Sequence, residues 1–144
     1  MTKKHTDKFG IFCFIDIDDF KPVNDTYGHK TGDVYLKTFA DRLRTLPFDP
    51  SIIMRIAGDE FGVFIGGLDA VDTSLTESLW ETITDRVSGP ISIEGHDHPL
   101  SFSLGMAVYN DHTKDIHELI DMADKAMYKA KETGNTYSVY KKEG

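Results

Sequence analysis

The sequence has one cysteine among its 144 residues, so it cannot form an internal disulfide. A chain without disulfides is typical of a reducing compartment, and we expect a cytoplasmic protein or the cytoplasmic domain of a membrane-anchored one. The cysteine, Cys13, lies inside the apolar run Phe9–Ile15. This position predicts a small core residue and argues against a catalytic nucleophile.

Long hydrophobic runs and an excess of basic charge are also missing. No stretch approaches the roughly 20 apolar residues of a membrane-spanning helix, and the polar start Met1–Asp7 does not resemble a secretory leader. Lys and Arg number 16 against 24 Asp and Glu, a formal net charge of −8. This balance argues against a nucleic-acid polymer as partner, whereas a small phosphorylated ligand needs only a local cluster of cations.

The composition is that of a soluble globular protein, with 40% hydrophobic and 28% charged residues. Repeats, low-complexity segments and linkers are absent from the sequence, so we expect one domain over residues 1–144.

Hydrophobic periodicity predicts an α+β fold with a mostly antiparallel central sheet flanked by helices. Strands are expected at Phe9–Ile15, Ile52–Ile56, Phe61–Ile65 (ended by Gly66-Gly67), Pro90–Glu94, Pro99–Tyr109 (after a turn at Gly95–Asp97) and Tyr137–Tyr140. Helices are expected at Phe20–Tyr27, at Thr31–Leu46 before Pro47 and Pro50, after a capping box Ser74-x-x-Glu77, and from Asp115 to Gly134.

Acidic residues follow the first predicted strand, in the run Asp16-Ile17-Asp18-Asp19. Alternation along a strand sends Asp16 and Asp18 to one face and Ile17 to the other. Hard cations such as Mg²⁺ bind one or two carboxylates together with substrate phosphates. The alternative is a solvated acidic turn.

A second acidic group, Gly58-Asp59-Glu60, lies at the tip of a predicted hairpin after Arg55. Glycine at a tip permits a positive φ and close approach of a ligand. The alternative is an ordinary charged turn. If the first and third strands are neighbours, the two acidic groups can hold metal ions together.

Asn24 and Asp33 suggest recognition of a base. A carboxylate can accept hydrogen bonds from the N1–H and 2-amino group of guanine, a donor pair that adenine lacks. The alternatives are helix capping by Asp33 and a turn role for Asn24. His29 lies between them and is equally consistent with a guanine-side role and with capping or packing.

Basic residues supply candidate phosphate ligands. Lys21 follows the acidic strand end and can reach triphosphate oxygens. Lys129 is expected on the surface, and spacing alone leaves Lys131 undecided.

Together these motifs resemble the GGDEF family of diguanylate cyclases. The resemblance covers nearly the whole chain in the correct order. It rests on Asp16-Ile17-Asp18-Asp19-Phe20-Lys21-Pro22-Val23-Asn24-Asp25, Gly28-His29, Gly32-Asp33, Arg55-Ile56-Ala57-Gly58-Asp59-Glu60-Phe61, Ser103-Leu104-Gly105 and Ala123-Asp124-Lys125-Ala126-Met127-Tyr128-Lys129-Ala130-Lys131.

The resemblance implies a nucleotidyl cyclase fold, similar to a polymerase palm, and a role for each motif residue. Metal ligands would be Asp16, the Ile17 carbonyl and Asp59, and catalytic residues would be Asp59, Glu60 and Lys21. Substrate would be bound by Phe20 and Lys21 through main-chain amides, by Asn24 and Asp33 at guanine, and by His29, Arg55, Gly58 and Lys131.

The reaction implied is condensation of two GTP into cyclic di-GMP and two pyrophosphates with Mg²⁺, for which Mn²⁺ can substitute. One domain holds one GTP, so the resemblance also implies a homodimer and an attached sensor or dimerising domain outside this chain.

The sequence departs from the family pattern at four places. Ala57 replaces the first glycine of the signature, and Asn135 stands where an arginine is usual. The stretch Phe48-Asp49-Pro50-Ser51 lacks the R-x-x-D inhibitory motif, so we expect no product feedback through it. The family's opening D-x-L-T-G-L-x-N-R helix is missing, which would expose part of the sheet. These departures leave open a degenerate domain that binds GTP and regulates an attached domain.

Overall fold

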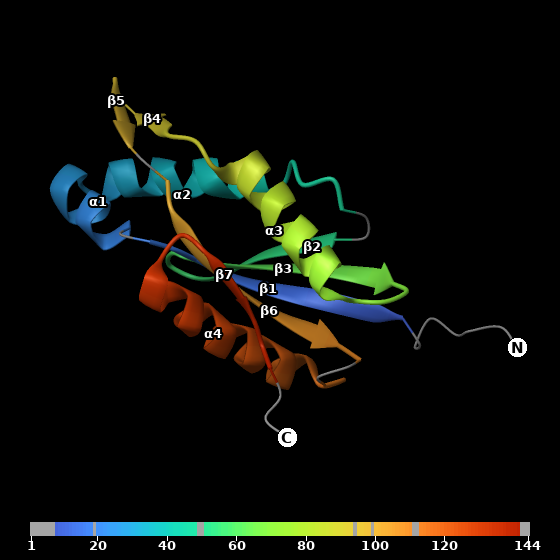
Figure 1. Ribbon diagram of the computed structural model, residues 1–144. Coiled ribbons are helices and arrows are strands. Elements are labelled where there is room, and N and C mark those ends of the chain that lie inside the picture. Colours follow the sequence, from blue (N-terminus) through green and yellow to red (C-terminus); the bar gives the residue numbers. More distant parts are fainter. Residues whose placement is uncertain are drawn as a thin grey trace, which may run out of the picture.

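The computed structural model describes residues 8–18, 20–48, 51–93, 95–98, 100–110 and 113–141. Its element order alternates strands, hairpins and helices, which confirms the expected α+β class (Figure 1). The elements are β1 (Phe9–Ile17), α1 (Phe20–Tyr27), α2 (His29–Leu43), β2 (Ser51–Ala57), β3 (Glu60–Leu68), α3 (Thr73–Val87), β4 (Ile91–Ile93), β5 (His96–His98), β6 (Phe102–Tyr109), α4 (Ile116–Thr133) and β7 (Tyr137–Val139).

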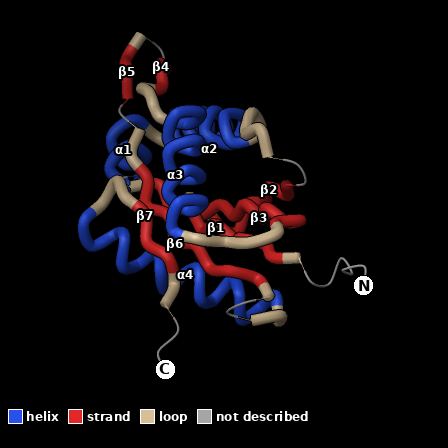
Figure 2. Tube along the Cα trace, turned by 45° about the vertical axis from the view of Figure 1, so that its right-hand side comes forward, coloured by secondary structure: helices blue, strands red, loops and turns tan. Residues whose placement is uncertain are grey.

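The main sheet has five strands in the order β2-β3-β1-β6-β7. All its pairings are antiparallel except that of β6 with β7. Helices α2 and α3 cover one face and α4 covers the other, as Figures 1 and 2 show. Strand β1 is therefore buried on both sides, which explains its continuous apolar sequence.

Side chains of β1 alternate between the two cores. Ile11, Cys13 and Ile15 belong to the core under α2 and α3, whereas Phe12 and Phe14 pack against α4. Burial raises the pKa of the Cys13 thiol to about 12, so it stays protonated and unreactive at neutral pH. The prediction of a core cysteine is confirmed.

Helix α2 differs from the predicted Thr31–Leu46. It begins two residues earlier, at His29, because Gly28 adopts a φ of 90° at the N-cap position. It ends at Leu43, where the amides of Arg44 and Thr45 close the last turn on Ala40 and Arg42. The helix thus stops before Pro47, so proline is not what ends it.

The second hairpin was predicted incorrectly. His96 and Asp97 were expected in a turn, but they pair with Ile93 and Ser92 as part of β5. Gly95, with a φ of 81°, makes the turn instead. Strand β6 then begins only at Phe102; the expected strand ends Glu94 and Pro99 lie outside the described residues.

Strand β3 also exceeds its prediction. It continues through Gly66-Gly67 to Leu68, because Leu68 still pairs with Phe9 of β1. The short final strand is confirmed at Tyr137–Val139.

Part of the sheet is exposed on the α4 side. Ile52 and Ile56 of β2 are 58% and 36% exposed. Met54, which shares their face, packs at the margin of the α4 core, so the side chains of α4 cover β1 and β6 better than β2. Among the described residues, none of the helices is sufficiently long and apolar to span a membrane.

The cap of α3 is Asp72, and the predicted capping box at Ser74 is wrong. The Asp72 carboxylate accepts a hydrogen bond from the Leu75 amide at 2.8 Å, whereas Ser74 lies inside the helix. We expect Asp72→Ala to lower the free energy of unfolding by about 1 kcal/mol. Ser74→Ala is the matched control and should change it by less than about 0.5 kcal/mol. Chemical denaturation measures both, and the reverse ranking would contradict the observed cap.

Candidate functional site

The two acidic groups meet because β1 and β3 are neighbours. The register of this pair places Asp16 directly opposite Glu60. The hairpin tip is tied to β1 as well, since the Ile17 amide donates to the Asp59 carbonyl at 3.2 Å. Carboxylates from chain segments more than 40 residues apart thus lie at one end of the sheet. Asp19 lies outside the described residues.

Lys131 joins these carboxylates from the last turn of α4. Its Nζ lies 2.9 Å from Asp16 Oδ2 and 3.5 Å from Asp18 Oδ1. One ammonium can reach both aspartates only if they share a face, so the predicted alternation is confirmed. Lys129 is exposed, as expected, whereas Lys131, which spacing alone left undecided, is half-buried.

Asp18 has a role that sequence reasoning missed. It accepts hydrogen bonds from Ser101 Oγ at 2.7 Å, from Ser103 Oγ at 2.8 Å and from the Asn135 amide at 2.9 Å. Burial raises the pKa of Asp18, but these hydrogen bonds and the charge of Lys131 outweigh it and lower the pKa overall. Asp18 is therefore an ionised anchor for the turn after α4.

Asn135 adopts a φ of 51°, a conformation in which asparagine is tolerated better than most residues. A cavity of about 400 Å³ opens beside this turn. Its lining consists of Asp18, Ser101, Lys131, Thr133, Gly134 and Asn135.

Asp16 is the most perturbed acid of the site. It is 8% exposed, and burial raises its pKa to about 6, with the charges of Asp59 and Glu60 adding to the effect and Lys131 opposing it. Its Oδ1 atom is buried and has no hydrogen-bond partner. A buried carboxylate oxygen without a donor is unfavourable unless a cation approaches it.

Glu60 is also harder to ionise than usual. Its pKa is raised first by burial, then by the charges of Asp124 and Asp59. Asp124 projects from α4 and was not predicted as part of the site. The only sequence signal was its place in the motif that ends at Lys131.

These donors fit a hard divalent cation that completes its shell with phosphate oxygens. Among the described residues, groups of three or more His, Cys, Asp or Glu side chains arranged for a metal are absent. The described side chains alone therefore do not form a complete coordination shell for a metal ion. Asp16 and Asp59 provide two neighbouring carboxylates, and Mg²⁺ is commonly bound by one or two carboxylates together with phosphate oxygens.

The predicted base-recognition residues lie on α1 and α2. Asn24 Nδ2 is 3.3 Å from His29 Nδ1, and the absence of a Cβ at Gly32 leaves room for the Asn24 side chain between the helices. Asp33 is an exposed residue inside α2, so it does not cap the helix. It lines a cavity of about 480 Å³ together with Leu36, Ala40, Arg55 and Phe61, among others.

The backbone of the hairpin tip differs from the expectation for Gly58. Gly58 and Ala57 are both absent from the positive-φ residues, so the tip does not require glycine for its backbone and Ala57 is not strained. The Arg55 guanidinium donates through Nε and Nη2 to the Gly58 carbonyl at 3.0 and 2.8 Å. Arg55 thus holds the tip in shape.

The remaining predicted residues lie at the start of α1 and before β2. Phe20 is half-buried against Tyr35, with ring centroids 6.1 Å apart, and Lys21 is exposed. Phe48, where the inhibitory motif would begin, packs against the core. Asp49 and Pro50 of that stretch lie outside the described residues.

The chain matches known sequences over nearly its whole length. The family described as "Diguanylate cyclase, GGDEF domain" matches residues 1–136. This chain belongs to the GGDEF family. Its signature is the variant Ala57-Gly58-Asp59-Glu60-Phe61.

Relatives of this GGDEF domain are longer proteins. It is 40% identical over 121 residues to the bifunctional diguanylate cyclase/cyclic di-GMP phosphodiesterase MucR of Pseudomonas aeruginosa, covering 84% of this chain and 17% of MucR. It is 36% identical over 126 residues to the diguanylate cyclase DgcS of Shewanella oneidensis, covering 87% of this chain and 40% of DgcS. The chain thus spans less than half the length of either relative.

Solved structures share the fold. The crystal structure of the GGDEF domain of YfiN (or TpbB) from Pseudomonas aeruginosa has a TM-score of 0.86 and 29% identity, covering 94% of this chain and 84% of that one. The predicted nucleotidyl cyclase fold class is confirmed.

Proposed function

We propose that residues 1–144 form a single GGDEF domain. We further propose that this domain is a diguanylate cyclase that condenses two GTP into cyclic di-GMP. The observation that carries the proposal is the convergence of Asp16, Asp59 and Glu60 with Lys131 at one sheet end. This arrangement offers oxygen ligands for a cation and an ammonium for a triphosphate in one place.

In each half of the reaction, a 3′-hydroxyl attacks the α-phosphorus of the facing GTP. The new phosphodiester bond forms as the bond to the β-phosphate oxygen breaks, and pyrophosphate leaves. Bound Mg²⁺, or Mn²⁺ in its place, would lower the pKa of the hydroxyl and neutralise developing charge. Asp16, Asp59 and the Ile17 carbonyl would hold the ion.

The protein's own residues would bind and orient the GTP and accept the proton of its 3′-hydroxyl. Lys131 and Lys21, with the main-chain amides of Phe20 and Lys21, would hold the triphosphate. Glu60 would accept the 3′-proton, because its raised pKa makes it a better base than an ordinary surface carboxylate. Gly58 leaves the tip open to the nucleotide, since a Cβ there would meet no atom within 4 Å.

Two domains must face each other, since one domain holds one GTP. We propose a homodimer as the active species, brought together by an attached sensor or dimerising domain. The greater length of MucR and DgcS agrees with attached domains.

The deciding experiment is product analysis after incubation of concentrated protein with GTP and Mg²⁺, alone and fused to a dimerising coiled coil. Cyclic di-GMP is expected, with more from the fusion. Samples with EDTA or with ATP in place of GTP should yield none. If the fused protein binds GTP but forms no product, the cyclase proposal is wrong.

Metal binding should depend on pH with a definite sign. The pKa of Asp16 is raised from 3.8 to about 6 in the folded protein. Between these two pH values the folded protein therefore keeps a proton on Asp16 that the unfolded chain has released. Stability from this group is therefore lost as pH rises from about 4 to 6, while cation affinity rises through pH 6. With Mn²⁺ as the probe, measured by water-proton relaxation without nucleotide, we expect about fivefold weaker binding at pH 5 than at pH 6, in proportion to the ionised fraction of Asp16. Equal affinity at both values would remove Asp16 from the metal site.

Base selection is proposed to rest on Asp33 and Asn24. Asp33→Ala removes the acceptor for the guanine N1–H and 2-amino donors, so the preference for GTP over ATP should fall about 10- to 100-fold. Asp41→Ala, on the same helix and cavity wall, is the control and should leave the preference intact. Competition binding measures the ratio; an unchanged ratio in Asp33→Ala would place base recognition elsewhere.

A second candidate function is a GTP-binding domain that regulates an attached domain. It is favoured by Asn135, which provides no cation where the family usually has arginine. A relative with 31% identity, NbdA of Pseudomonas aeruginosa, is named as a cyclic di-GMP phosphodiesterase and not as a cyclase. This function predicts Mg²⁺-dependent thermal stabilisation by GTP without product.

A further inference from the structure

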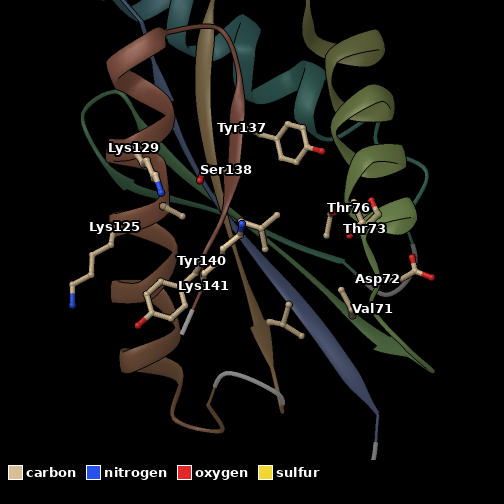
Figure 3. Close-up of a pocket in the computed structure, with 13 residues that line it drawn as sticks. Val71, Asp72, Thr73, Thr76, Lys125, Lys129, Tyr137, Ser138, Tyr140 and Lys141 are labelled. Carbon is tan, nitrogen blue, oxygen red and sulfur yellow. Dashed lines mark hydrogen bonds between the residues drawn. The ribbon is translucent and has the colours of Figure 1, made fainter. Parts of the chain in front are cut away.

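A cavity of about 790 Å³ surrounds the outer edge of β7 and shares no lining residue with the carboxylate site. One wall comes from the start of α3, with Val71, Thr73 and Thr76, and the other from α4, with Lys125 and Lys129. Figure 3 shows β7 passing between these walls, with Tyr137 on the side of α3 and Tyr140 on the side of α4.

The outer edge of β7 has backbone N–H and C=O groups that point away from β6 and can pair with another strand. In the described sheet β7 is the last strand, next to β6. The Leu104 amide donates to the Thr136 carbonyl and the Tyr140 amide donates to the Met106 carbonyl. Because successive residues of a strand point their backbone groups to opposite sides, Tyr137 and Val139 direct theirs away from β6.

Nothing in the sequence of this edge blocks pairing. Residues 137–141 contain no proline, so each outward residue keeps its N–H. Side chains of an added strand would alternate between the α3 wall and the α4 wall, since Tyr137 and Val139 pack toward one core and Tyr140 toward the other.

The positive charge of the cavity lining indicates which kind of partner it would bind. Lys125, Lys129 and Lys141 line the cavity, although the whole chain has a net charge of −8. Of these three lysines, Lys125 forms an ion pair with Asp121 at 3.3 Å. Two copies of β7 paired with each other would bring these lysines together, which disfavours self-association through this edge.

The wall formed by the start of α3 disfavours acidic side chains, because it carries the carboxylate of Asp72. Asp72 lies there, with its carboxylate already engaged as the cap of α3, beside Val71 and Thr73. We propose that the β7 edge binds an extended segment of a partner protein, with acidic side chains facing Lys125 and Lys129 and small apolar or hydroxyl side chains facing α3. The partner adds a strand to the main sheet.

A seven-residue peptide of alternating valine and glutamate is a suitable probe, because about seven residues in extended form exceed the length of β7. Titration of the whole chain, followed by amide chemical shifts, should move the signals of Tyr137, Val139 and Lys141. The same peptide with N-methyl groups on alternate amides should bind at least about tenfold more weakly, since it cannot complete the ladder. Equal binding of both peptides, or no shifts along β7, would overturn the proposal.

Charge-reversal variants test the wall. Lys125→Glu/Lys129→Glu should lower the affinity for the valine–glutamate peptide on the order of tenfold. The same double variant should raise the affinity for a valine–lysine peptide of equal length. Lys37→Glu/Lys114→Glu is the matched control, because both lysines are exposed and lie outside this cavity. Equal loss of binding in both double variants would mean that the lysines act only through net charge and would refute the site. Loss of binding in the control alone would refute it as well, because Lys125 and Lys129 would then not contact the peptide.

Discussion

Asp59→Asn is expected to lower turnover of GTP by at least about 10³-fold, because it removes one of the two carboxylates proposed to hold the metal ion. The substitution keeps the size of the side chain, and the backbone link from the Ile17 amide to the Asp59 carbonyl does not involve the carboxylate. The fold should therefore persist while the charge is lost. Mg²⁺-dependent stabilisation of the protein by GTP should weaken in parallel.

Initial-rate measurements of pyrophosphate release, made on the dimerised protein, give the activity. Thermal unfolding with GTP, with and without Mg²⁺, gives the binding. Asp97→Asn is the control, since Asp97 is an exposed carboxylate on β5. Wild-type turnover in Asp59→Asn would exclude Asp59 from the metal site, whereas equal losses in both variants would point to a general effect of charge.

Gly105→Ala is expected to lower the free energy of unfolding by about 3 kcal/mol or more, a large value for one methyl group. A Cβ at this position would overlap backbone atoms of Ala123 and Met127, so α4 would have to move away from β6. Backbone atoms cannot rotate aside as the end of a side chain can. Since α4 also carries Lys131, the displacement should disturb the carboxylate site.

Denaturant titration measures this loss of stability. Gly58→Ala is the matched control for stability, because it adds the same methyl group where no atom lies within 4 Å and where φ is not positive. It should leave the midpoint nearly unchanged. A midpoint for Gly105→Ala close to that of Gly58→Ala would show that α4 does not pack on β6 as tightly as described.

Stretches with strong periodicity were predictable from the sequence alone. The run from Phe9 onward reads as a buried strand because both of its faces meet apolar layers, and alternation along it placed Asp16 and Asp18 on one face. The long helix between Asp115 and Gly134 was also predictable, since its cap, its apolar stripe and its terminal glycine agree with one another.

Boundaries set by local competition were less predictable. Ser74 and Asp72 are both good cap residues, and only the folded chain shows which carboxylate or hydroxyl meets a free amide. The turn in the second hairpin was misplaced for a similar reason, because short strands such as β4 and β5 carry too few residues for a clear period.

The amino-acid sequence by itself thus determined the α+β class, the family and the residue types available for chemistry. Only the tertiary structure decided that Lys131 bridges Asp16 and Asp18, that Asp18 anchors the turn at Asn135, and that Asp124 lies near Glu60. The physical reason is that these contacts join residues far apart in the chain. Periodicity reports which way a side chain points within its own element, whereas the partner it meets depends on how strands pair and how a helix crosses the sheet.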